Sequence, residues 1–233
     1  MSLLKLVENE ATDELDSLSI YDYGDKMKLT FIWDLDGTLL DSYEAILAGI
    51  QETYEQFDLP FDREEIRDYI LKYSVKDLLM RDAKEYGLNS DEFNRVRATS
   101  LREKSTLIPL MIGAREILTW AAEKGIQQFV YTHKSNNAFQ VLADLGIDSH
   151  FVEIVTSDSG FARKPSPEAL LYLIEKYQLN PASTYYIGDR LLDLQTALNA
   201  GIRSINLKID GFENNCKIAT LNDIKQLIEN ENI

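Results

Sequence analysis

The stretch that most constrains the fold of this chain is LTFIWDLDGTLLD, residues 29–41. It begins with a run of apolar, β-branched and aromatic residues, which is typical of a buried strand. The run ends abruptly at Asp34 and Asp36, which precede Gly37 and Thr38. Two carboxylates at the end of a buried strand repel each other and are costly to desolvate, and a hydrated divalent cation would relieve both problems. A strand followed by a polar turn fits equally well, so Asp-x-Asp alone does not decide.

Composition limits the classes of protein to which the chain can belong. It has 233 residues, of which 45% are hydrophobic and 27% charged, typical of a globular protein with one core and room for a smaller domain. The net charge of −15 argues against nucleic acid or membrane as a partner, but not against a small anionic substrate. The single cysteine, Cys216, excludes an internal disulfide framework and a cysteine zinc site. Neither a membrane-spanning run nor a secretory signal is visible, so the expected location is cytoplasmic.

Three parts are expected along the chain: an acidic N-terminal extension at 1–27, an α/β core made of 28–41 and 107–233, and an inserted helical domain at 42–106. Asp41–Glu44 resembles a capping box ahead of the first inserted helix. No strand signal appears between residues 40 and 106. The helices expected there are Tyr43–Phe57, Arg63–Tyr73, Val75–Tyr86 and Asp91–Lys104.

From residue 107 onward, helix and strand signals alternate, with glycine after several of the helices. Such alternation predicts right-handed βαβ units and a parallel sheet covered by helices on both faces. The expected helices are Gly113–Lys124, Asn136–Leu145, Pro167–Tyr177, Leu191–Ala200 and Thr220–Glu229. The expected strands are Ile126–Tyr131, Phe151–Val155, Thr184–Ile187 and, last in the chain, Ile202–Leu207.

Polar residues follow the predicted strands where each one ends. In an open parallel sheet the carboxyl ends of the strands form the binding edge, so these residues are expected to converge. Three carboxylates, a hydroxyl and a lysine meeting there fit a metal-assisted phosphoryl site, with oxygen ligands for Mg²⁺ and donors for the phosphate. The residues concerned are Asp34 and Asp36, Thr132, Lys164, Asp189 and Asp193.

In their order, these motifs resemble those of the haloacid dehalogenase superfamily, subfamily IA, in the branch of phosphoglycolate phosphatase and β-phosphoglucomutase. The matching segments are DLDGT at 34–38, Thr132, KPSP at 164–167 and GDRLLD at 188–193. The resemblance spans roughly residues 29–207. It implies a Rossmann-like core with a C1-type helical cap that closes over the site and excludes water.

The resemblance also implies a role for each motif residue. Asp34 would be the nucleophile that forms an aspartyl-phosphate, and Asp36 the general acid and base, provided that its pKa is raised. Thr132 and Lys164 would bind phosphate oxygens. The ligands implied for Mg²⁺ are Asp34, the backbone carbonyl of Asp36, and Asp189, with Asp193 orienting the shell.

Several residues near these motifs have two interpretations. His133 stands where the family often has asparagine, and is either a substrate ligand or a polar loop residue. The specificity loop of the cap should fall near residues 71–76, so Tyr73 and Lys76 are candidate substrate contacts. Lys72 and Lys76 would meet an anionic group of the substrate or lie in solvent. Arg163 and Arg190 are expected to be surface charges near the mouth of the site.

The favoured function is a Mg²⁺-dependent phosphatase, acting as a monomer or homodimer on a small phosphorylated metabolite such as phosphoglycolate or a sugar phosphate. A phosphosugar mutase uses the same nucleophile and acid, and a pyrophosphatase also fits. Dehalogenation is disfavoured because it does not need the acid and base supplied by Asp36. A non-catalytic binding protein is disfavoured because all the motif residues are present.

Overall fold

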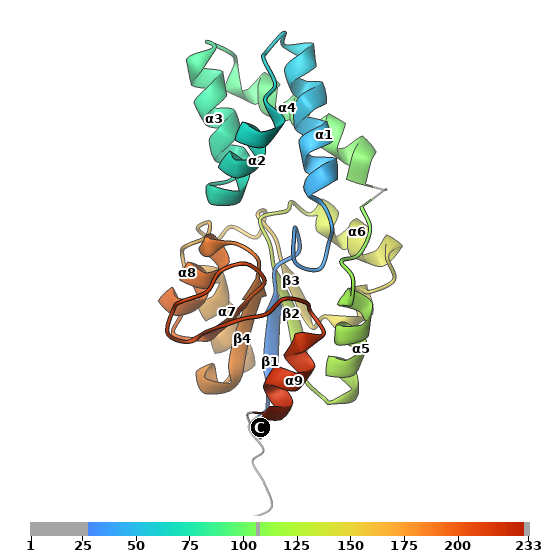
Figure 1. The fold of residues 1–233 in the computed structure, drawn as a ribbon, viewed down its shortest axis with the longest axis vertical. Coiled ribbons are helices and arrows are strands. Elements are labelled where there is room, and N and C mark those ends of the chain that lie inside the picture. Colours follow the sequence, from blue (N-terminus) through green and yellow to red (C-terminus); the bar gives the residue numbers. More distant parts are fainter. Residues whose placement is uncertain (1–27, 106–107, 231–233) are drawn as a thin grey trace, which may run out of the picture.

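The computed structural model describes residues 28–105 and 108–230 (Figure 1). Within these residues, parallel strands form one sheet in the order β3-β2-β1-β4-β5-β6. Because β1 is flanked by β2 and β4, the chain builds outward from β1 on both sides, and the strand order switches beside it. The strands are β1 (Thr30–Trp33), β2 (Gln127–Tyr131), β3 (Glu153–Val155), β4 (Thr184–Gly188), β5 (Arg203–Asn206) and β6 (Asn215–Lys217).

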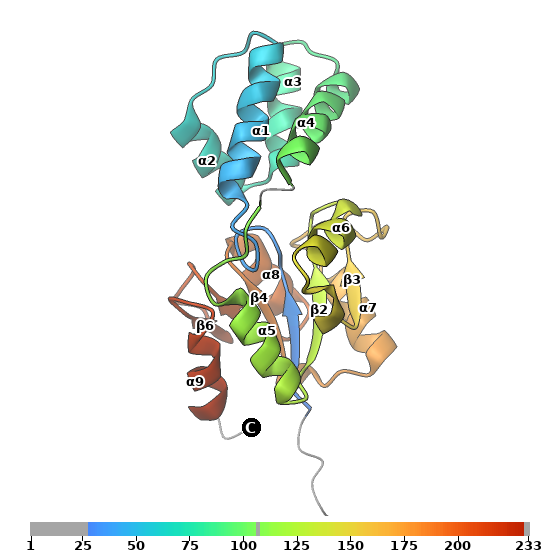
Figure 2. The ribbon, with the colours of Figure 1, turned by 90° about the vertical axis from the view of Figure 1, so that its right-hand side faces the viewer.

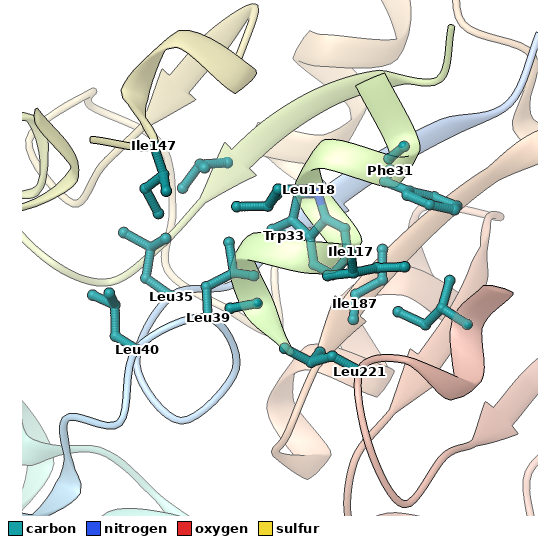
Figure 3. Close-up of a cluster of buried hydrophobic side chains, with 14 of the residues drawn as sticks. Phe31, Trp33, Leu35, Leu39, Leu40, Ile117, Leu118, Ile147, Ile187 and Leu221 are labelled. Carbon is teal, nitrogen blue, oxygen red and sulfur yellow. The ribbon is translucent and has the colours of Figure 1, made fainter. Parts of the chain in front are cut away.

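The central strand β1 is buried on both faces, which explains why its sequence is a continuous apolar run. Phe31 and Trp33 point to one face and pack in the cluster drawn in Figure 3. Ile32 points to the other face, where it joins a second cluster with Phe129 and Tyr186. The two-residue period of a strand therefore divides the core between the two faces of the sheet.

Helices cover both faces, as the alternation of signals predicts. The cluster around Trp33 is closed by α5 (Ala114–Glu123), α6 (Asn137–Asp144) and α9 (Asp223–Asn230). The opposite cluster is closed by α7 (Glu168–Tyr177) and α8 (Leu191–Asn199). Short 3₁₀ turns lie at Asp148–His150 and Pro181–Ser183. The Rossmann-like α/β fold is thus confirmed.

The inserted segment forms a helical block with a hydrophobic cluster of its own. In Figures 1 and 2 this block lies at one end of the molecule, beyond the edge at which the strands of the sheet finish. Inside it, the ring of Tyr54 packs edge-on against Phe61 and also contacts Phe93. Its helices are α1 (Tyr43–Gln56), α2 (Arg63–Lys72), α3 (Val75–Glu85) and α4 (Ser90–Ser105).

Local capping explains where two of these helices begin. Asp62 precedes α2 and accepts hydrogen bonds from the backbone N–H groups of Glu64 and Glu65, both at 3.0 Å. Ser74 precedes α3 and accepts one from Asp77 at 3.1 Å. Both cap residues have extended backbones, which turns their side chains toward the first free N–H groups of the helix.

The capping box expected at Asp41–Glu44 is wrong. Ser42 is the residue before α1, but its backbone is already helical (φ −101°, ψ −12°), and its side chain makes no capping hydrogen bond. A residue in that conformation cannot turn its hydroxyl back toward the first turn. The entry to α1 is held instead by the backbone, because Asp41 N–H donates to the Pro109 carbonyl at 3.0 Å.

The sequence suggested that Ile202–Leu207 is the last strand, but this is wrong because β6 follows it. This strand has three residues and pairs with β5 at the sheet edge, with Cys216 opposite Ile205. An edge strand with asparagine and lysine at its ends has no apolar run for sequence reasoning to detect. No described helix combines the length and apolarity needed to cross a membrane. The expected N-terminal extension at 1–27 lies outside the described residues.

Candidate active site

Asp34 directly follows β1, and its side chain is only 1% exposed. Its backbone N–H donates to the Ile187 carbonyl on β4 at 2.9 Å, which extends the strand pairing and fixes where the side chain points. The next residues turn back sharply, since Gly37 N–H donates to the Leu40 carbonyl at 2.8 Å. Gly37 has φ +83°, and a Cβ there would lie 2.7 Å from an oxygen of Asp189. Only glycine allows the loop to pass so close to that carboxylate.

Lys164 lies between two carboxylates beneath the surface. Its Nζ lies 2.7 Å from Oδ1 of Asp34 and 2.7 Å from Oδ1 of Asp193. The rings of Tyr131 and Tyr186 flank the ammonium, with centroids at 5.1 Å and 5.2 Å. Although burial disfavours its charge, the pKa of Lys164 lies above the ordinary value because both aspartates stabilise the ammonium. The structure therefore holds a permanent cation beside Asp34.

Asp189 and Asp193 follow β4 and are both buried. The Oδ2 of Asp189 accepts hydrogen bonds from the Tyr43 hydroxyl at 2.7 Å and from the Lys208 ammonium at 2.6 Å. Asp193 lies in the first turn of α8, where its Oδ2 accepts from the backbone N–H of Arg190 at 3.0 Å. Asp193 thus caps its own helix while its other oxygen binds Lys164.

Asp34, Asp189 and Asp193 form a cluster that suits a divalent metal. One ligand atom of each carboxylate lies within 4.8 Å of the others. Oδ2 of Asp34 and Oδ1 of Asp189 are buried and have no hydrogen-bond partner among the described residues. A buried carboxylate oxygen without a donor is costly, and hard oxygen ligands are those that Mg²⁺ prefers. The carboxylate oxygens of this cluster therefore fit Mg²⁺.

The pKa values of these carboxyl groups reflect the same crowding. Burial raises the pKa of Asp34 to about 7, although Lys164 beside it favours the charged form. Burial and the neighbouring Asp193 raise the pKa of Asp189. For Asp193 itself, burial acts in the same direction, but Lys164 and Arg190 outweigh it, so that its pKa lies below the usual value.

Asp36 lies in a different electrostatic environment from Asp34. It is partly exposed, and Lys134 donates to its two oxygens at 2.9 Å and 3.3 Å. Burial tends to raise the pKa of Asp36, but the charge and hydrogen bonds of Lys134 outweigh it and the net pKa is lowered. The raised pKa that an acid role requires is therefore absent in this structure. Sequence reasoning missed Lys134, which is 6% exposed although lysines in loops usually lie in solvent.

Thr132 and His133 follow β2. The Thr132 hydroxyl is buried and accepts a hydrogen bond from the Lys134 N–H at 3.1 Å. His133 Nε2 accepts from the Lys164 N–H at 2.9 Å, so the proton of the neutral ring lies on Nδ1. Burial and nearby cations, Lys164 first, lower the pKa of His133 and keep the ring neutral. Its Nδ1 is buried and has no partner among the described residues.

A cavity of about 370 Å³ separates the helical block from this cluster. Asp36 and His133 line it from the core, and Lys76 lines it from the start of α3. Tyr73 is 43% exposed and packs against Tyr69 rather than lining the cavity. Of the two loop residues chosen from the sequence, the structure brings only Lys76 to the cavity.

The sequence suggested that Arg163 and Arg190 are surface charges near the mouth of the site. In the structure both are partly buried and line this cavity. Lys208 and Tyr43, which bind Asp189, were likewise missed. Their partner, Asp189, lies far from Tyr43 in the chain. A single lysine after a strand, or a single tyrosine at the start of a helix, forms no sequence pattern that would indicate such a contact. Only the folded structure brings them together.

Comparison with known proteins identifies the family. Residues 31–207 match the family described as haloacid dehalogenase-like hydrolase. Phosphoglycolate phosphatase of Haemophilus influenzae (strain 86-028NP) is 30% identical over 207 residues, covering 82% of this chain and 89% of that protein. Phosphoglycolate phosphatase of Vibrio vulnificus (strain YJ016) is 31% identical over 191 residues, covering 75% and 81% respectively.

A solved structure agrees with this assignment. A haloacid dehalogenase superfamily hydrolase, subfamily IA, variant 1, from Geobacter sulfurreducens has a TM-score of 0.69 and 26% identity, and the match covers 86% of this chain and 96% of that one. The family match extends over more than half of the sequence and includes every motif at the strand ends. The chain therefore belongs to the haloacid dehalogenase-like hydrolases and is an enzyme of their phosphoglycolate phosphatase-like branch.

Proposed function

We propose that this protein is a Mg²⁺-dependent phosphatase that hydrolyses a small phosphorylated metabolite through an aspartyl-phosphate on Asp34. The observation that carries the proposal is the buried Oδ2 of Asp34, which has no hydrogen-bond partner among the described residues although Oδ1 binds Lys164. A carboxylate oxygen that is desolvated and free of donors is a competent nucleophile. The named relatives are phosphatases, which supports this reaction class.

The metal would be held by Asp189, whose buried Oδ1 is free to bind it, and by Oδ1 of Asp34, so that Oδ2 of Asp34 is left to attack phosphorus. Asp193 lies in the same cluster, but both its oxygens already accept hydrogen bonds, so its role is to hold Lys164 and the start of α8. When bound, Mg²⁺ supplies positive charge that screens the phosphate from the attacking carboxylate.

In the first half of the reaction, Asp34 attacks phosphorus, and the bond from phosphorus to the ester oxygen breaks. Asp36 gives its proton to that leaving oxygen, which departs as an alcohol. Lys164, and the hydroxyl of Thr132, would stabilise the charge on the phosphoryl oxygens. Because the ion pair with Lys134 favours the ionised form of Asp36, this ion pair must weaken before Asp36 can donate a proton, as it would if the anionic substrate drew Lys134 toward itself.

In the second half, water attacks the phosphorus of the aspartyl-phosphate. Asp36, now a carboxylate, takes a proton from that water, and the bond from phosphorus to Asp34 breaks. Inorganic phosphate leaves, and Asp34 is regenerated. The ion pair with Lys134 favours the ionised form of Asp36 that this step requires.

The helical block, residues 42–106, would act as a cap over the site. It contributes one wall of the cavity, and its own hydrophobic cluster allows it to move as a unit. Exclusion of bulk water would strengthen the electrostatic contacts to phosphate and protect the aspartyl-phosphate until its own water attacks.

The experiment that tests this function is phosphate release from a panel of phosphomonoesters, with and without Mg²⁺. We expect release by the wild-type protein with Mg²⁺ and none by Asp34→Asn, which cannot form the acyl-phosphate. Asp148→Asn, a matched change of an exposed aspartate, should retain wild-type activity. Full activity in Asp34→Asn would overturn the assignment of the nucleophile.

A further inference from the structure

The first residue of α1, Tyr43, connects the helical block to the metal-binding cluster. The chain enters the block from the core at this point (Figure 1). The Tyr43 hydroxyl donates to Oδ2 of Asp189 at 2.7 Å, across 146 positions of the sequence. The Tyr43 ring also packs against the hydrophobic cluster inside the block. One side chain thus contacts both the interior of the block and a carboxylate proposed to bind the metal.

The ring of Tyr43 is held against the core. It lies so close to Gly37 that a Cβ on this glycine would be 2.8 Å from the ring carbon Cζ. The ammonium of Lys208 lies over the ring, 4.7 Å from its centroid. Gly37 follows β1, whereas Lys208 follows β5. Two separate parts of the core therefore restrain the Tyr43 ring and fix where its hydroxyl points.

The two oxygens of Asp189 have different surroundings. Oδ2 accepts hydrogen bonds from the Tyr43 hydroxyl at 2.7 Å and from the Lys208 ammonium at 2.6 Å. Oδ1 is buried and has no hydrogen-bond partner among the described residues. Donors on one oxygen of a carboxylate restrict its rotation and therefore decide where the other oxygen points. The hydrogen bonds to Oδ2 thus leave Oδ1 in a fixed place for the metal.

Tyr43 and Lys208 differ in their effect on a bound cation. The charge of Lys208 repels a divalent metal held by the same carboxylate. A hydroxyl is neutral, so the hydrogen bond from Tyr43 orients Asp189 without this repulsion. The filling of space does not explain the hydroxyl, because phenylalanine would pack against the block and Gly37 equally well. The feature that tyrosine adds at this position is the hydrogen bond to Asp189.

We propose that Tyr43 is a positioning residue that ties the helical block to the metal site, because its hydroxyl orients Asp189. The inference rests on the proposed Mg²⁺-dependent function and names a residue outside the ligand set that determines metal affinity. Loss of an outer donor of this kind typically weakens metal affinity by about 10- to 100-fold. Lys208 still binds Oδ2 when the hydroxyl is removed, so we expect an effect at the lower end of this range.

Because Tyr43 belongs to α1, the orientation of Asp189 and the position of the start of this helix depend on each other. Mg²⁺ bound to Asp189 would favour the orientation in which Oδ2 meets the hydroxyl, and would thereby hold the start of α1 against the core. Coupling between two sites is reciprocal, so the metal is itself bound more tightly when the helix is held. Metal binding in the core would therefore be felt in the helical block.

The first test is the affinity for Mg²⁺, measured by calorimetry on the full chain without substrate. Tyr43→Phe keeps the ring and removes only the hydroxyl, so we expect Kd to rise about tenfold. Tyr54→Phe is the matched control, because the Tyr54 hydroxyl on α1 bonds Asp82 on α3, wholly within the block. Its Kd should equal that of the wild type. A wild-type Kd in Tyr43→Phe, or an equal rise in Tyr54→Phe, would overturn the proposal.

The second test measures the coupling by hydrogen exchange of the same proteins, without Mg²⁺ and at saturating Mg²⁺. In the wild type, Mg²⁺ should slow exchange in the first turn of α1, where the Ile46 N–H donates to the Ser42 carbonyl at 2.9 Å. This turn holds none of the proposed metal ligands. Tyr43→Phe should lose the slowing in α1 and keep it around Asp189, whereas Tyr54→Phe should keep both. Unchanged slowing of α1 in Tyr43→Phe would contradict the coupling.

Neither test measures turnover, which separates this proposal from the phosphatase function. If no ester is hydrolysed but Tyr43→Phe weakens Mg²⁺ binding and loses the slowing in α1, the role of Tyr43 stands and the phosphatase function fails. If esters are hydrolysed but Tyr43→Phe binds Mg²⁺ as the wild type does, the function stands and the role of Tyr43 fails. If the wild-type protein binds no Mg²⁺, both fail.

Discussion

The ammonium of Lys134 lies 2.9 Å from Oδ1 of Asp36, while the nearby Asp34 is buried with one oxygen free. The pKa of Asp36 is consequently lowered, whereas burial raises that of Asp34 to about 7. The pKa values of two carboxyl groups separated by a single residue are thus shifted in opposite directions. These shifts oppose the proposed roles, in which Asp34 must be ionised to attack and Asp36 protonated to donate, so the reaction requires Lys134 to move away from Asp36.

Replacing Lys134 should shift the pH dependence of activity. In Lys134→Met the pKa of Asp36 loses its main lowering influence and rises, so the carboxylate needed for the second step is lost at a higher pH. We expect the acid limb of the kcat profile to move upward by about one pH unit or more. The control is Lys124→Met, an exposed lysine. An acid limb that stays in place would show that Lys134 does not set the pKa of Asp36.

Asp34→Asn should stabilise the metal-free protein at pH 8. The folded pKa of about 7 lies above the ordinary 3.8, so the folded state binds more protons between these values, and burying the charged form is unfavourable above pH 7. Asparagine removes that charge, and Lys164 keeps its partner Asp193. We expect the free energy of unfolding in urea to rise by about 1–4 kcal/mol. The gain should shrink as the pH falls from 7 toward 4.

Asp193→Asn should have the opposite effect. The folded pKa of Asp193 is lowered, so its charge contributes stability that is present above its unfolded pKa and is lost as pH falls through the folded value. The variant also weakens the bonds to Lys164 and to the start of α8. We expect a loss of about 2–4 kcal/mol at pH 8 in the same urea titration. A change in the free energy of unfolding of the same sign and size in Asp34→Asn and Asp193→Asn would contradict the different roles of the two carboxylates.

Gly37→Ala should abolish activity and destabilise the loop after β1. The new methyl group would lie 2.7 Å from Asp189 Oδ2 and would also clash with a ring carbon of Tyr43. Gly125→Ala is a matched control, because Gly125 has a similar φ of +72° but no atom within 4 Å of the new methyl group. Both should show the backbone penalty of about 1 kcal/mol in thermal unfolding, while only Gly37→Ala should lose turnover.

Lys208→Met should strengthen Mg²⁺ binding. The Lys208 ammonium lies 2.6 Å from Asp189 Oδ2 and repels a divalent cation held by the same carboxylate. Its removal should lower the Kd about 3- to 30-fold, measured by calorimetry on the protein without substrate. Lys217→Met, an exposed lysine on β6, should leave Kd unchanged. A weaker affinity in Lys208→Met would mean that Lys208 orients Asp189 for the metal.

Much of the fold could be predicted because its signals are local. The apolar run before Asp34 and the glycines after several helices mark the elements directly, and the parallel sheet then brings the strand ends to one edge. This is also why Lys164 and Asp193, almost thirty residues apart in the chain, could be expected in one site. The motif residues lie where the topology of the sheet dictates.

The remainder of the site depends on contacts that no local pattern records. Arg97 lines the cavity from an otherwise strongly polar helix, α4, where charged residues normally face solvent. Lys134 and Lys208 meet their carboxylates only through the tertiary fold. Tyr73 shows the converse, because its position in the loop suggested a substrate contact, yet its ring packs on Tyr69 outside the cavity lining.

The central claim is that Asp34 carries the phosphoryl group. The most direct measurement is mass spectrometry of peptides from protein that is turning over a preferred ester with Mg²⁺ and is quenched in acid. We predict that the mass of one phosphoryl group appears on the peptide containing Asp34, disappears when substrate is exhausted, and is absent in Asp34→Asn. Phosphate release by the wild-type protein with no such peptide, or with the phosphoryl group on another residue, would contradict it.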